Sequence, residues 1–494
     1  MHQSPDVENE TKAYLPNSRD LLVQQLEQAT ANESTSIMEK LTFLSEQSAK
    51  AVRIGNTTKQ RQFGVYYTGF TLARALIEEV VELQGSTDGT FFEPCVGGGA
   101  FLIAFIEAAV SGTTDPSKIE LENVLKRCYV ADSDPLALEN LREFLPLYLL
   151  ARYGHALALP EHNMFLGDSL LDDSEQGTRV RDFQDLFGLS NKFDFVVTNP
   201  PYLLLKSDSR LGDEHATSTQ ALAAKIKKPG LFKHSQGVPN LYKLFTEAIL
   251  DNWMADDGTA GLLIPRSLMT DKQSGKLRDH ILANFRLGPI ASLDEGNDFF
   301  KSVGQSFSAF AARKGEPTIE VSFAEISGQP ARFNRSSKRS LKSLNSIVRT
   351  GALFDFTESE WDTLSILSGL RMMSESPQIV NLRGEFDVSL DREYLSTVPT
   401  NLKLIRGSDI GFFSLSESDT FVAAEFLKRP KGKWVSQSRL ACQQISNMNG
   451  NRRLKWARIP PGNVLANSCN FLAIDTDKLG DDPIASLDFL LGLL

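Results

Sequence analysis

Between about residue 63 and residue 316, the chain alternates between two hydrophobic patterns. In the first, apolar residues recur every three or four positions, as in residues 71–83 and 240–254, which predicts helices, and residues 100–110 predict an apolar helix. In the second, short stretches are almost wholly apolar, as in residues 193–197 and 258–265. Such stretches are typical of strands that are covered on both faces. The alternation therefore predicts an α/β domain with a doubly wound, mainly parallel, Rossmann-like sheet.

The rest of the chain follows other patterns. Residues 1–60 are polar with some helical spacing, which predicts a helical N-terminal segment ahead of an α/β domain at 61–316. Residues 206–239 are rich in Lys, Ser, Asp and Gly and predict a long loop. From about residue 317 the elements become shorter and mixed, which predicts a second, α+β domain over 317–494. A chain of 494 residues is expected to hold more than one domain.

Composition excludes several classes of protein. The hydrophobic content of 41% and charged content of 23% are those of a soluble globular protein. No apolar run approaches the roughly 18 residues needed to cross a bilayer, and the polar N-terminus does not read as a secretory signal. The four cysteines form no CxxC pair, so we expect neither a zinc site nor a disulfide framework. A reducing cytoplasm fits this cysteine usage best, and we expect no membrane partner and no metal.

Charge is distributed unevenly along the chain. The net charge is −10, yet residues 317–494 hold 21 basic and 20 acidic residues. Residues 332–349 contain six basic residues and no acid, and residues 426–458 contain nine and no acid. These clusters are either solvated charged faces or a phosphate-binding surface. The candidate DNA contacts within them are Arg332, Arg335, Lys338, Arg339, Lys431, Lys433, Arg452 and Arg453.

Four motifs follow successive predicted strands. The first is FFEPCVGGGA (91–100), in which glycines between a strand and a helix allow close approach of a ligand. Asp132 and Asp168 end the next two strands, where carboxylates can accept hydrogen bonds from a nucleoside; Asp134-Pro135 predicts a helix cap. The fourth is Asn199-Pro200-Pro201-Tyr202, a stiff loop after a buried strand. The carboxyl edge of such a sheet is where ligands bind.

The order of YYTG (66–69), EPCVGGGAFL (93–102), VADSDP (130–135), GDS (167–169) and NPPY (199–202) resembles adenine-N6 DNA methyltransferases of the gamma, TaqI-like class. Segments 381–395, 404–410 and 440–472 resemble the modification enzymes of type IIS restriction systems. The resemblance implies a methyltransferase domain over 61–316 and a DNA target-recognition domain over 317–494. Relatives usually continue further, so we expect the latter domain to be incomplete at its C-terminus.

The resemblance also implies roles for single residues. The cofactor would be S-adenosyl-L-methionine, contacted by Thr68, Glu93, Gly97, Gly99, Asp132 and Asp168. The aromatic walls for a flipped base would be Tyr202 and Phe300, although Phe299 and Phe300 can equally be core residues; Tyr242 is expected to pack against the sheet. The implied partners are double-stranded DNA and a restriction endonuclease, with or without a cytosine methyltransferase for the other strand.

The NPPY loop suits transfer of a methyl group to an exocyclic amine. The lone pair of such an amine is delocalised into the base, so the nitrogen is a poor nucleophile. The side-chain carbonyl of Asn199 and the main-chain carbonyl of Pro200 can accept its two hydrogens and direct the lone pair at the methyl group, while Pro201 stiffens the loop. The ring of Tyr202 can stack on a base extruded from the duplex.

Two alternatives to site-specific DNA adenine-N6 methylation stay open from the sequence. The same NPPY chemistry can serve methylation of ribosomal RNA or of a protein glutamine. The chain could also be a non-catalytic DNA-binding subunit that has kept the fold. The intact Asn199, Pro200 and Tyr202 favour an enzyme, and the long C-terminal domain favours DNA as the substrate.

Overall fold

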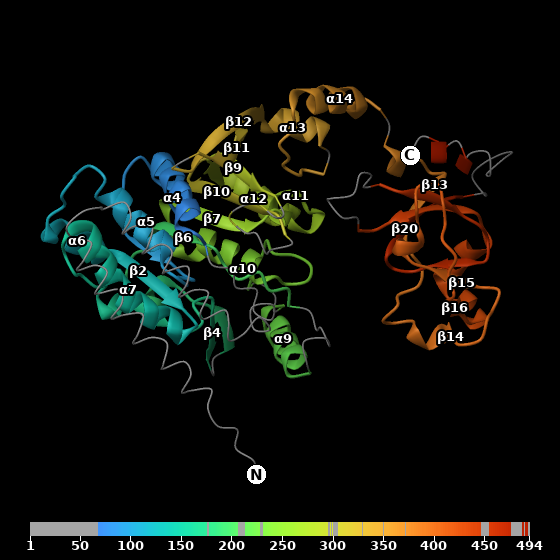
Figure 1. Ribbon diagram of the computed structural model, residues 1–494, viewed down its shortest axis with the longest axis horizontal. Helices are drawn as coiled ribbons and strands as arrows, with labels where there is room; N and C mark the ends of the chain where they lie inside the picture. The colour runs from blue at the N-terminus through green and yellow to red at the C-terminus, as the bar shows by residue number, and fades with distance from the viewer. Residues whose placement is uncertain are drawn as a thin grey trace, which may run out of the picture. The chain divides into compact units, whose positions relative to one another are not determined.

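The computed structural model describes most of the chain after residue 67. The described residues are 68–174, 177–205, 213–227, 231–294, 297, 299, 305–328, 330–348, 350–370, 372–445, 454–475, 487–488 and 490–492. The predicted N-terminal helical segment 1–60 therefore lies outside the described residues. The chain divides into two compact units, Met1–Ser365 and Ile366–Leu494 (Figure 1). Within the described part, no helix has the length and apolar character that spanning a bilayer would require.

The first unit is built on a large mixed sheet that confirms the predicted α/β class. Among the described residues it has ten strands, in the order β12-β11-β9-β10-β7-β6-β1-β2-β3, with β8 pairing with β10. Strands β3, β2, β1, β6 and β7 are parallel to one another, and β10 is antiparallel to β7. The strand bounds are β1 Phe91–Glu93, β2 Cys128–Asp132, β3 Met164–Leu166, β6 Phe193–Thr198, β7 Met254–Pro265, β8 Phe285–Leu287, β9 Ile290–Leu293, β10 Phe307–Lys314, β11 Glu320–Ser327 and β12 Arg332–Ser340.

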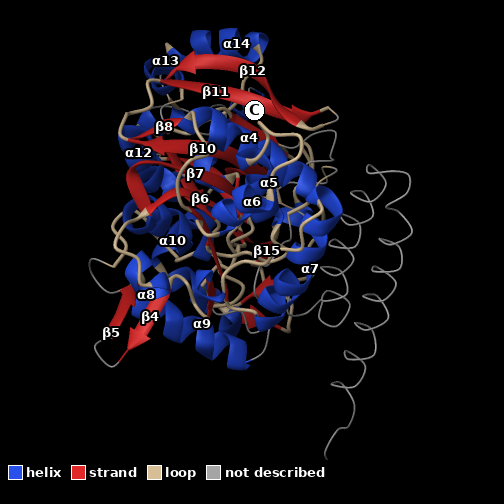
Figure 2. Ribbon diagram, turned by 90° about the vertical axis from the view of Figure 1, so that its left-hand side faces the viewer, coloured by secondary structure: helices blue, strands red, loops and turns tan. Residues whose placement is uncertain are grey.

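Helices cover both faces of the sheet, which explains why its central strands are apolar throughout. In β1, Phe91 joins the core on one face and Phe92 the core on the other, because successive side chains of a strand point to opposite faces. One face is covered by α4 Phe70–Gln84, α5 Ala100–Ala109, α6 Lys118–Leu125 and α7 Pro135–Tyr153. The other is covered by α8 Phe183–Phe187, α9 Asp213–Ile226, α10 Leu241–Ala248, α11 Ser267–Thr270, α12 Gly275–Asn284 and α13 Leu341–Ile347 (Figure 2).

The ends of α7 follow from local sequence signals. Asp134 is its N-cap and accepts a hydrogen bond from the Leu136 backbone N–H at 3.0 Å, with Pro135 in the first turn. At the other end Gly154 takes a left-handed conformation (φ 75°), which removes the steric cost that a side chain would carry there. The prediction that Asp134-Pro135 caps this helix is therefore confirmed.

The large sheet continues past residue 316, where the sequence predicted a domain boundary. Strands β11 and β12 form an antiparallel pair, and β11 continues the large sheet by pairing in parallel with β9. Helix α13 then packs on the sheet core through the buried Leu344. The first unit consequently extends to Ser365. The sequence could not separate this hairpin from the strands of the second unit, because short strands have the same local pattern in both.

The second unit consists mainly of strands joined by short 3-10 turns. One four-stranded sheet has the order β13-β20-β17-β18 and another the order β14-β16-β15-β19, counted over the described residues. Their bounds are β13 Ile379–Arg383, β14 Leu395–Ser396, β15 Lys403–Ile405, β16 Phe421–Val422, β17 Arg439–Gln443, β18 Trp456–Ile459, β19 Asn463–Leu465 and β20 Cys469–Ile474. Arg439 on β17 forms a fully buried ion pair with Glu385, at 2.7 Å, between the two sheets.

Candidate active site

The candidate site lies where the strand order of the sheet reverses. From β1 the chain continues to β2 and β3 on one side, whereas β6 and β7 lie on the other side of β1. In doubly wound sheets, the crevice at the carboxyl ends of the two strands that flank this switch point is the usual ligand site. Here those strands are β1 and β6, and the glycine loop and the NPPY loop follow them directly.

The glycine loop after β1 depends on glycine at two positions. Gly97 (φ 50°) and Gly99 (φ 75°) both lie in the left-handed region that side chains disfavour. A Cβ at Gly99 would also come within 2.7 Å of Leu141 Cδ1 on α7. Because Gly99 is the N-cap of α5, the loop leads into a helix N-terminus whose backbone N–H groups favour electronegative ligand atoms.

Asp132 ties together the loops after β1 and β2. Its Oδ2 accepts a hydrogen bond from the Gly97 backbone N–H, and its Oδ1 accepts one from the Asp134 N–H, each at 2.9 Å. Burial raises the pKa of this carboxyl, and the two hydrogen bonds act in the opposite direction. Each carboxylate oxygen retains a second lone pair, so hydroxyl groups of a ligand can still bind there.

Glu93 has a structural role that the motif did not reveal. It is 2% exposed, and its Oε2 accepts a hydrogen bond from the Leu102 backbone N–H at 2.9 Å in the first turn of α5. Burial raises the pKa of this carboxyl well above its ordinary value, and the nearby Asp132 adds to the effect. Glu93 therefore holds the first turn of α5, the helix that follows the glycine loop. The cofactor contact implied for Glu93 by the resemblance stays a prediction.

Asp168 lies in a tight turn after β3. Its Oδ1 accepts hydrogen bonds from the backbone N–H groups of Leu170 (2.9 Å) and Leu171 (3.1 Å). The neighbouring Ser169 donates its hydroxyl hydrogen to the Pro94 carbonyl at 2.9 Å, which joins this turn to the loop after β1. The loops that carry Asp132 and Asp168 are thus both bonded to the loop that follows β1.

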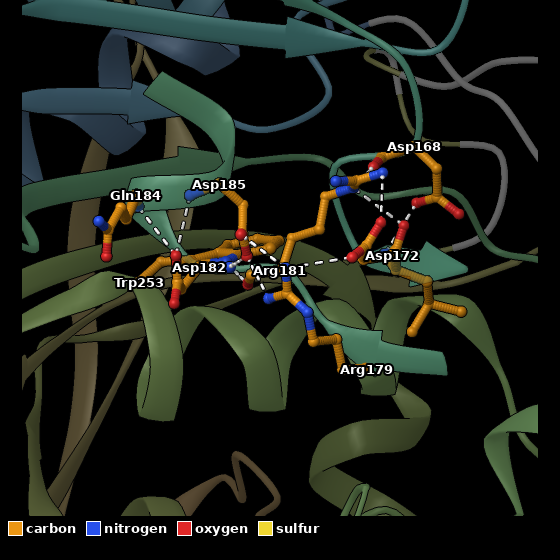
Figure 3. Close-up of polar contacts among 9 residues, drawn as sticks. Asp168, Asp172, Arg179, Arg181, Asp182, Gln184, Asp185 and Trp253 are labelled. Carbon is orange, nitrogen blue, oxygen red and sulfur yellow. Dashed lines mark hydrogen bonds and ion pairs between the residues drawn. The ribbon is translucent and has the colours of Figure 1, made fainter. Parts of the chain in front are cut away.

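Arg181, which no sequence pattern singled out, is hydrogen-bonded to the same turn. Arg181 follows the hairpin β4 (Leu171–Ser174) and β5 (Gly177–Val180), and its Nε donates to the carbonyls of Asp168 at 2.9 Å and Leu171 at 3.0 Å (Figure 3). Its guanidinium also pairs with Asp172 at 3.1 Å. The Arg181 carbonyl in turn accepts the indole N–H of Trp253 at 2.7 Å, so the main chain and the side chain are both anchored.

Asn199 and Thr68 meet at the end of β6, although 131 residues separate them. The Asn199 amide nitrogen donates to Thr68 Oγ1 at 3.0 Å, and Asn199 Oδ1 accepts a hydrogen bond from the Tyr202 hydroxyl. Pro200 is buried and Pro201 partly buried, so the loop is held by packing as well as by its rings. The amide is therefore oriented from both ends.

Tyr202 is turned toward the sheet in this conformation. Its hydroxyl also lies 3.0 Å from the Leu263 carbonyl, which shares the single hydroxyl hydrogen with Asn199 Oδ1, and its ring centroid lies 5.3 Å from that of Phe307. Tyr242 meets it edge to face at 6.3 Å and is itself 2% exposed, which agrees with the expectation that Tyr242 packs against the sheet. Two phenylalanines were considered for the second ring against a flipped base. Phe299 is partly buried against the core, and Phe300 lies outside the described residues.

The basic cluster on β12 does not present uncompensated charge. Each of its four candidate DNA contacts is paired with a carboxylate: Arg332 with Glu78, Arg335 with Glu82, Lys338 with Glu320 and Arg339 with Glu358. In the second cluster, the Lys433 ammonium lies 4.6 Å from the centre of the Trp434 ring. Arg452 and Arg453 lie outside the described residues, as does the side chain of Lys431.

The fold and the site together define a doubly wound α/β domain with the glycine loop and the NPPY loop at its switch point. Residues 126–300 match the model of the Eco57I restriction-modification methylase family. The matched residues include Asp132, Asp168 and the whole NPPY loop. The sequence-based recognition of this class of enzyme is confirmed.

Individual relatives are more distant. The chain is 27% identical over 139 residues to the methylase subunit of the type I restriction enzyme MjaIX from Methanocaldococcus jannaschii, covering 28% of this chain and 19% of that protein. Among solved structures, the type IIG restriction endonuclease BpuSI is 14% identical, with 91% of this chain and 57% of that one covered and a TM-score of 0.45. The EcoKI M protein is 16% identical, with 55% and 51% covered and a TM-score of 0.35. The chain thus spans about half the length of these structures and a fifth of the curated relative.

Proposed function

We propose that the protein is a site-specific DNA methyltransferase that moves a methyl group from S-adenosyl-L-methionine to the N6 amine of adenine, as the modification enzyme of a restriction-modification system. The observation that carries this proposal is the position of Asn199. It is oriented by Thr68 and Tyr202 at the carboxyl end of β6, beside the glycine loop at the switch point of the sheet. The matched methylase family supports the same reaction class.

The residues at the switch point fit the proposed cofactor. Gly97 and Gly99 keep side chains away from the helix N-terminus, and Asp132 and Asp168 place acceptors at the ends of β2 and β3, suited to ribose hydroxyls and an adenine amine. Thr68, bonded to Asn199, would adjoin the methionine part. When bound, the cofactor supplies a methyl group on a positively charged sulfur, which a neutral amine can attack.

Asn199 and Pro200 would prepare the amine for that attack. The Asn199 side-chain oxygen accepts one hydrogen bond from Tyr202 and has a second lone pair for an amine hydrogen, and the Pro200 carbonyl would take the other hydrogen. Both acceptors draw the nitrogen toward a pyramidal shape, which frees its lone pair. The nitrogen loses its proton only after the new N–C bond has formed, so no strong base is required.

Duplex DNA would have to release the target base before this chemistry begins. The amine is paired and stacked inside the helix, and extrusion costs a few kcal/mol, part of which stacking on Tyr202 and Phe300 would offset at about 1–3 kcal/mol per base. We assign target recognition to the second unit, with Lys431, Lys433, Arg452 and Arg453 as candidate contacts. A restriction endonuclease, with or without a cytosine methyltransferase, would be the functional partner.

Methyl transfer from labelled cofactor into unmethylated DNA, ribosomal RNA and protein tests the proposal. Asn199→Ala is expected to lower transfer into DNA by about 100-fold or more, the usual cost of one preorganised polar group, while cofactor affinity stays within about threefold. Asn191→Ala, on the exposed turn before the same strand, is the matched control and should transfer normally. Label in RNA or protein alone, or equal transfer by Asn199→Ala, would contradict the proposal.

A further inference from the structure

A second group of chemically versatile side chains lies at the opposite ends of the strands. Three residues, His234, Asp251 and His280, each offer one possible ligand atom. These two ring nitrogens and one carboxylate oxygen lie within 4.8 Å of one another. Asp251 lies in the π-helix Ile249–Trp253, directly before the amino end of β7, and His280 lies in α12. Asn199 follows the carboxyl end of β6, whose six residues span about 20 Å, so this group is distinct from the candidate active site.

The two rings and the carboxylate are already close to one another. His280 Nε2 lies 2.8 Å from Asp251 Oδ1, and the side chains are 16% and 35% exposed, respectively. The imidazoles of His234 and His280 are stacked, with centroids 3.8 Å apart and planes 9° from parallel. Fold stability alone gives little reason for two imidazoles and a carboxylate to gather at a partly exposed site. Neutral imidazole and carboxylate are, however, ligands that transition metals prefer.

The segment that carries His234 is held in place independently of the rings. The Glu247 carboxylate accepts hydrogen bonds from three consecutive backbone N–H groups, those of Lys233, His234 (3.0 Å) and Ser235 (2.8 Å). Glu247 is buried on α10, so it fixes the backbone of His234 against the helix that leads to Asp251. A preorganised backbone lowers the entropic cost of forming a site from separate segments.

The hydrogen bonds of His280 define its tautomer before an ion binds. Its Nδ1 lies 3.2 Å from the Asn284 side-chain nitrogen, and that nitrogen also donates to the His280 carbonyl at 2.9 Å, so Nδ1 accepts a hydrogen bond. The hydrogen of the neutral ring then lies on Nε2, toward Asp251. An ion bound at Nε2 would replace that hydrogen, Nδ1 would carry the hydrogen instead, and the Asn284 amide would turn away.

We propose that His234, Asp251 and His280 bind one divalent transition-metal ion, with Zn²⁺ as the best fit and water as the fourth ligand. An ion must lie near the plane of each imidazole that binds it, so the His234 ring would tilt out of the stack on binding. The ion would link three separate segments: the residues around His234, which precede α10, the π-helix before β7, and α12. This inference does not depend on the proposed methyl transfer.

Metal binding to the full-length, chelator-treated protein tests the site directly. Zn²⁺ titrated in a calorimeter should bind at one equivalent per chain, and Co²⁺ should give the visible absorption of a tetrahedral nitrogen and oxygen site. His234→Ala and His280→Ala should each weaken Zn²⁺ binding by at least about 100-fold, whereas Asn284→Ala should not weaken it, because the Asn284 amide favours the tautomer that cannot bind an ion at Nε2. His162→Ala, an exposed histidine elsewhere in the unit, should bind like the unmodified protein.

The design keeps folding apart from binding. Circular dichroism checks each variant, and Asp251→Asn offers a near-isosteric change if an alanine variant does not fold. Zn²⁺ should raise the melting temperature of the unmodified protein and not that of Asp251→Asn, because only an ion bound to the native state stabilises it. No binding at one equivalent, or binding that survives His234→Ala and His280→Ala, would overturn the site.

Discussion

At the scale of single residues, some side chains affect the candidate site only by positioning other residues. Asp168 can meet a ligand only if its turn keeps its shape, and Arg181 donates to two carbonyls of that turn. Sequence reasoning selected Asp168 because it ends a strand, which is a local signal. It passed over Arg181, because nothing near position 181 indicates that its side chain reaches back to residues 168 and 171. Long-range hydrogen bonds of this kind leave no trace in a single sequence.

Replacing Arg181 should therefore loosen the proposed cofactor site without touching the chemistry. Arg181→Ala removes the charged Nε–H that the two carbonyls share, which contributes about 1.5–3 kcal/mol in all, and part of this loss should appear as about tenfold weaker binding of S-adenosylmethionine. The KM for the cofactor should rise in proportion while kcat falls less than about threefold. Arg181→Lys should restore binding only in part, because a single ammonium lacks the planar fork of Arg.

Arg179 provides the matched control for this prediction. It lies on the same hairpin and pairs with Asp172 and Asp185, but the contacts described for it do not include the turn at 168–171 (Figure 3). Arg179→Ala should bind cofactor like the unmodified protein. Equal weakening by both substitutions would mean that the hairpin as a whole, and not Arg181, supports the site.

At the scale of elements, helix α4 carries a carboxyl in an unfavourable setting. Burial raises the pKa of Glu79 to about 7, and the neighbouring Glu82 and Glu78 add to the effect while Arg335 opposes it. The folded protein thus holds this proton more tightly than the unfolded chain, so stability should fall as the pH rises from about 4.5 to 7. A shift of this size corresponds to at most about 3 kcal/mol, and solvent screening reduces it.

Glu79→Gln should remove this pH dependence. Denaturant midpoints of the variant and the unmodified protein should differ least near about pH 3, well below the ordinary pKa of 4.5, where the carboxyl is protonated in both states. At pH 8 the variant should be more stable by about 1–2 kcal/mol, after allowance for screening. A stability difference that is the same at both pH values would show that Glu79 does not titrate in this range.

In the second unit, the buried ion pair joins the two sheets. Arg439 and Glu385 are fully buried, and the Glu385 Oε1 that meets Arg439 also accepts the Leu465 backbone N–H at 3.1 Å on β19. Glu385→Ala leaves a buried guanidinium without its partner and should lower the free energy of unfolding of this unit by about 3–5 kcal/mol. Glu393→Ala, at an exposed position of the same unit, should change it by less than about 0.5 kcal/mol in denaturant titrations.

Much of the architecture follows from patterns that act locally. The strand ends at Asp132 and Thr198, and the turn at Asp168 that follows the end of β3 at Leu166, could be predicted because each follows an apolar run. The groups that depend on distant neighbours could not: the acidic partners of Arg332 and Arg335 lie on α4, 253 residues away in the case of Glu82 and Arg335. His234, Asp251 and His280 likewise share no ligand spacing in the sequence.

At the scale of the whole molecule, the two basic clusters should behave differently toward DNA. Each lysine or arginine that neutralises a phosphate contributes about 0.9 to the slope of log affinity against log salt concentration. Arg452→Ala with Arg453→Ala should weaken DNA binding and lower that slope by about 2, if both contact phosphates. Arg332→Ala with Arg335→Ala removes the same number of charges from β12, where Glu78 and Glu82 already compensate them, so the slope should not change. An unchanged slope for the Arg452 and Arg453 variant would mean that these residues are not in the interface, while a lower slope for the β12 variant would restore that strand as a DNA contact.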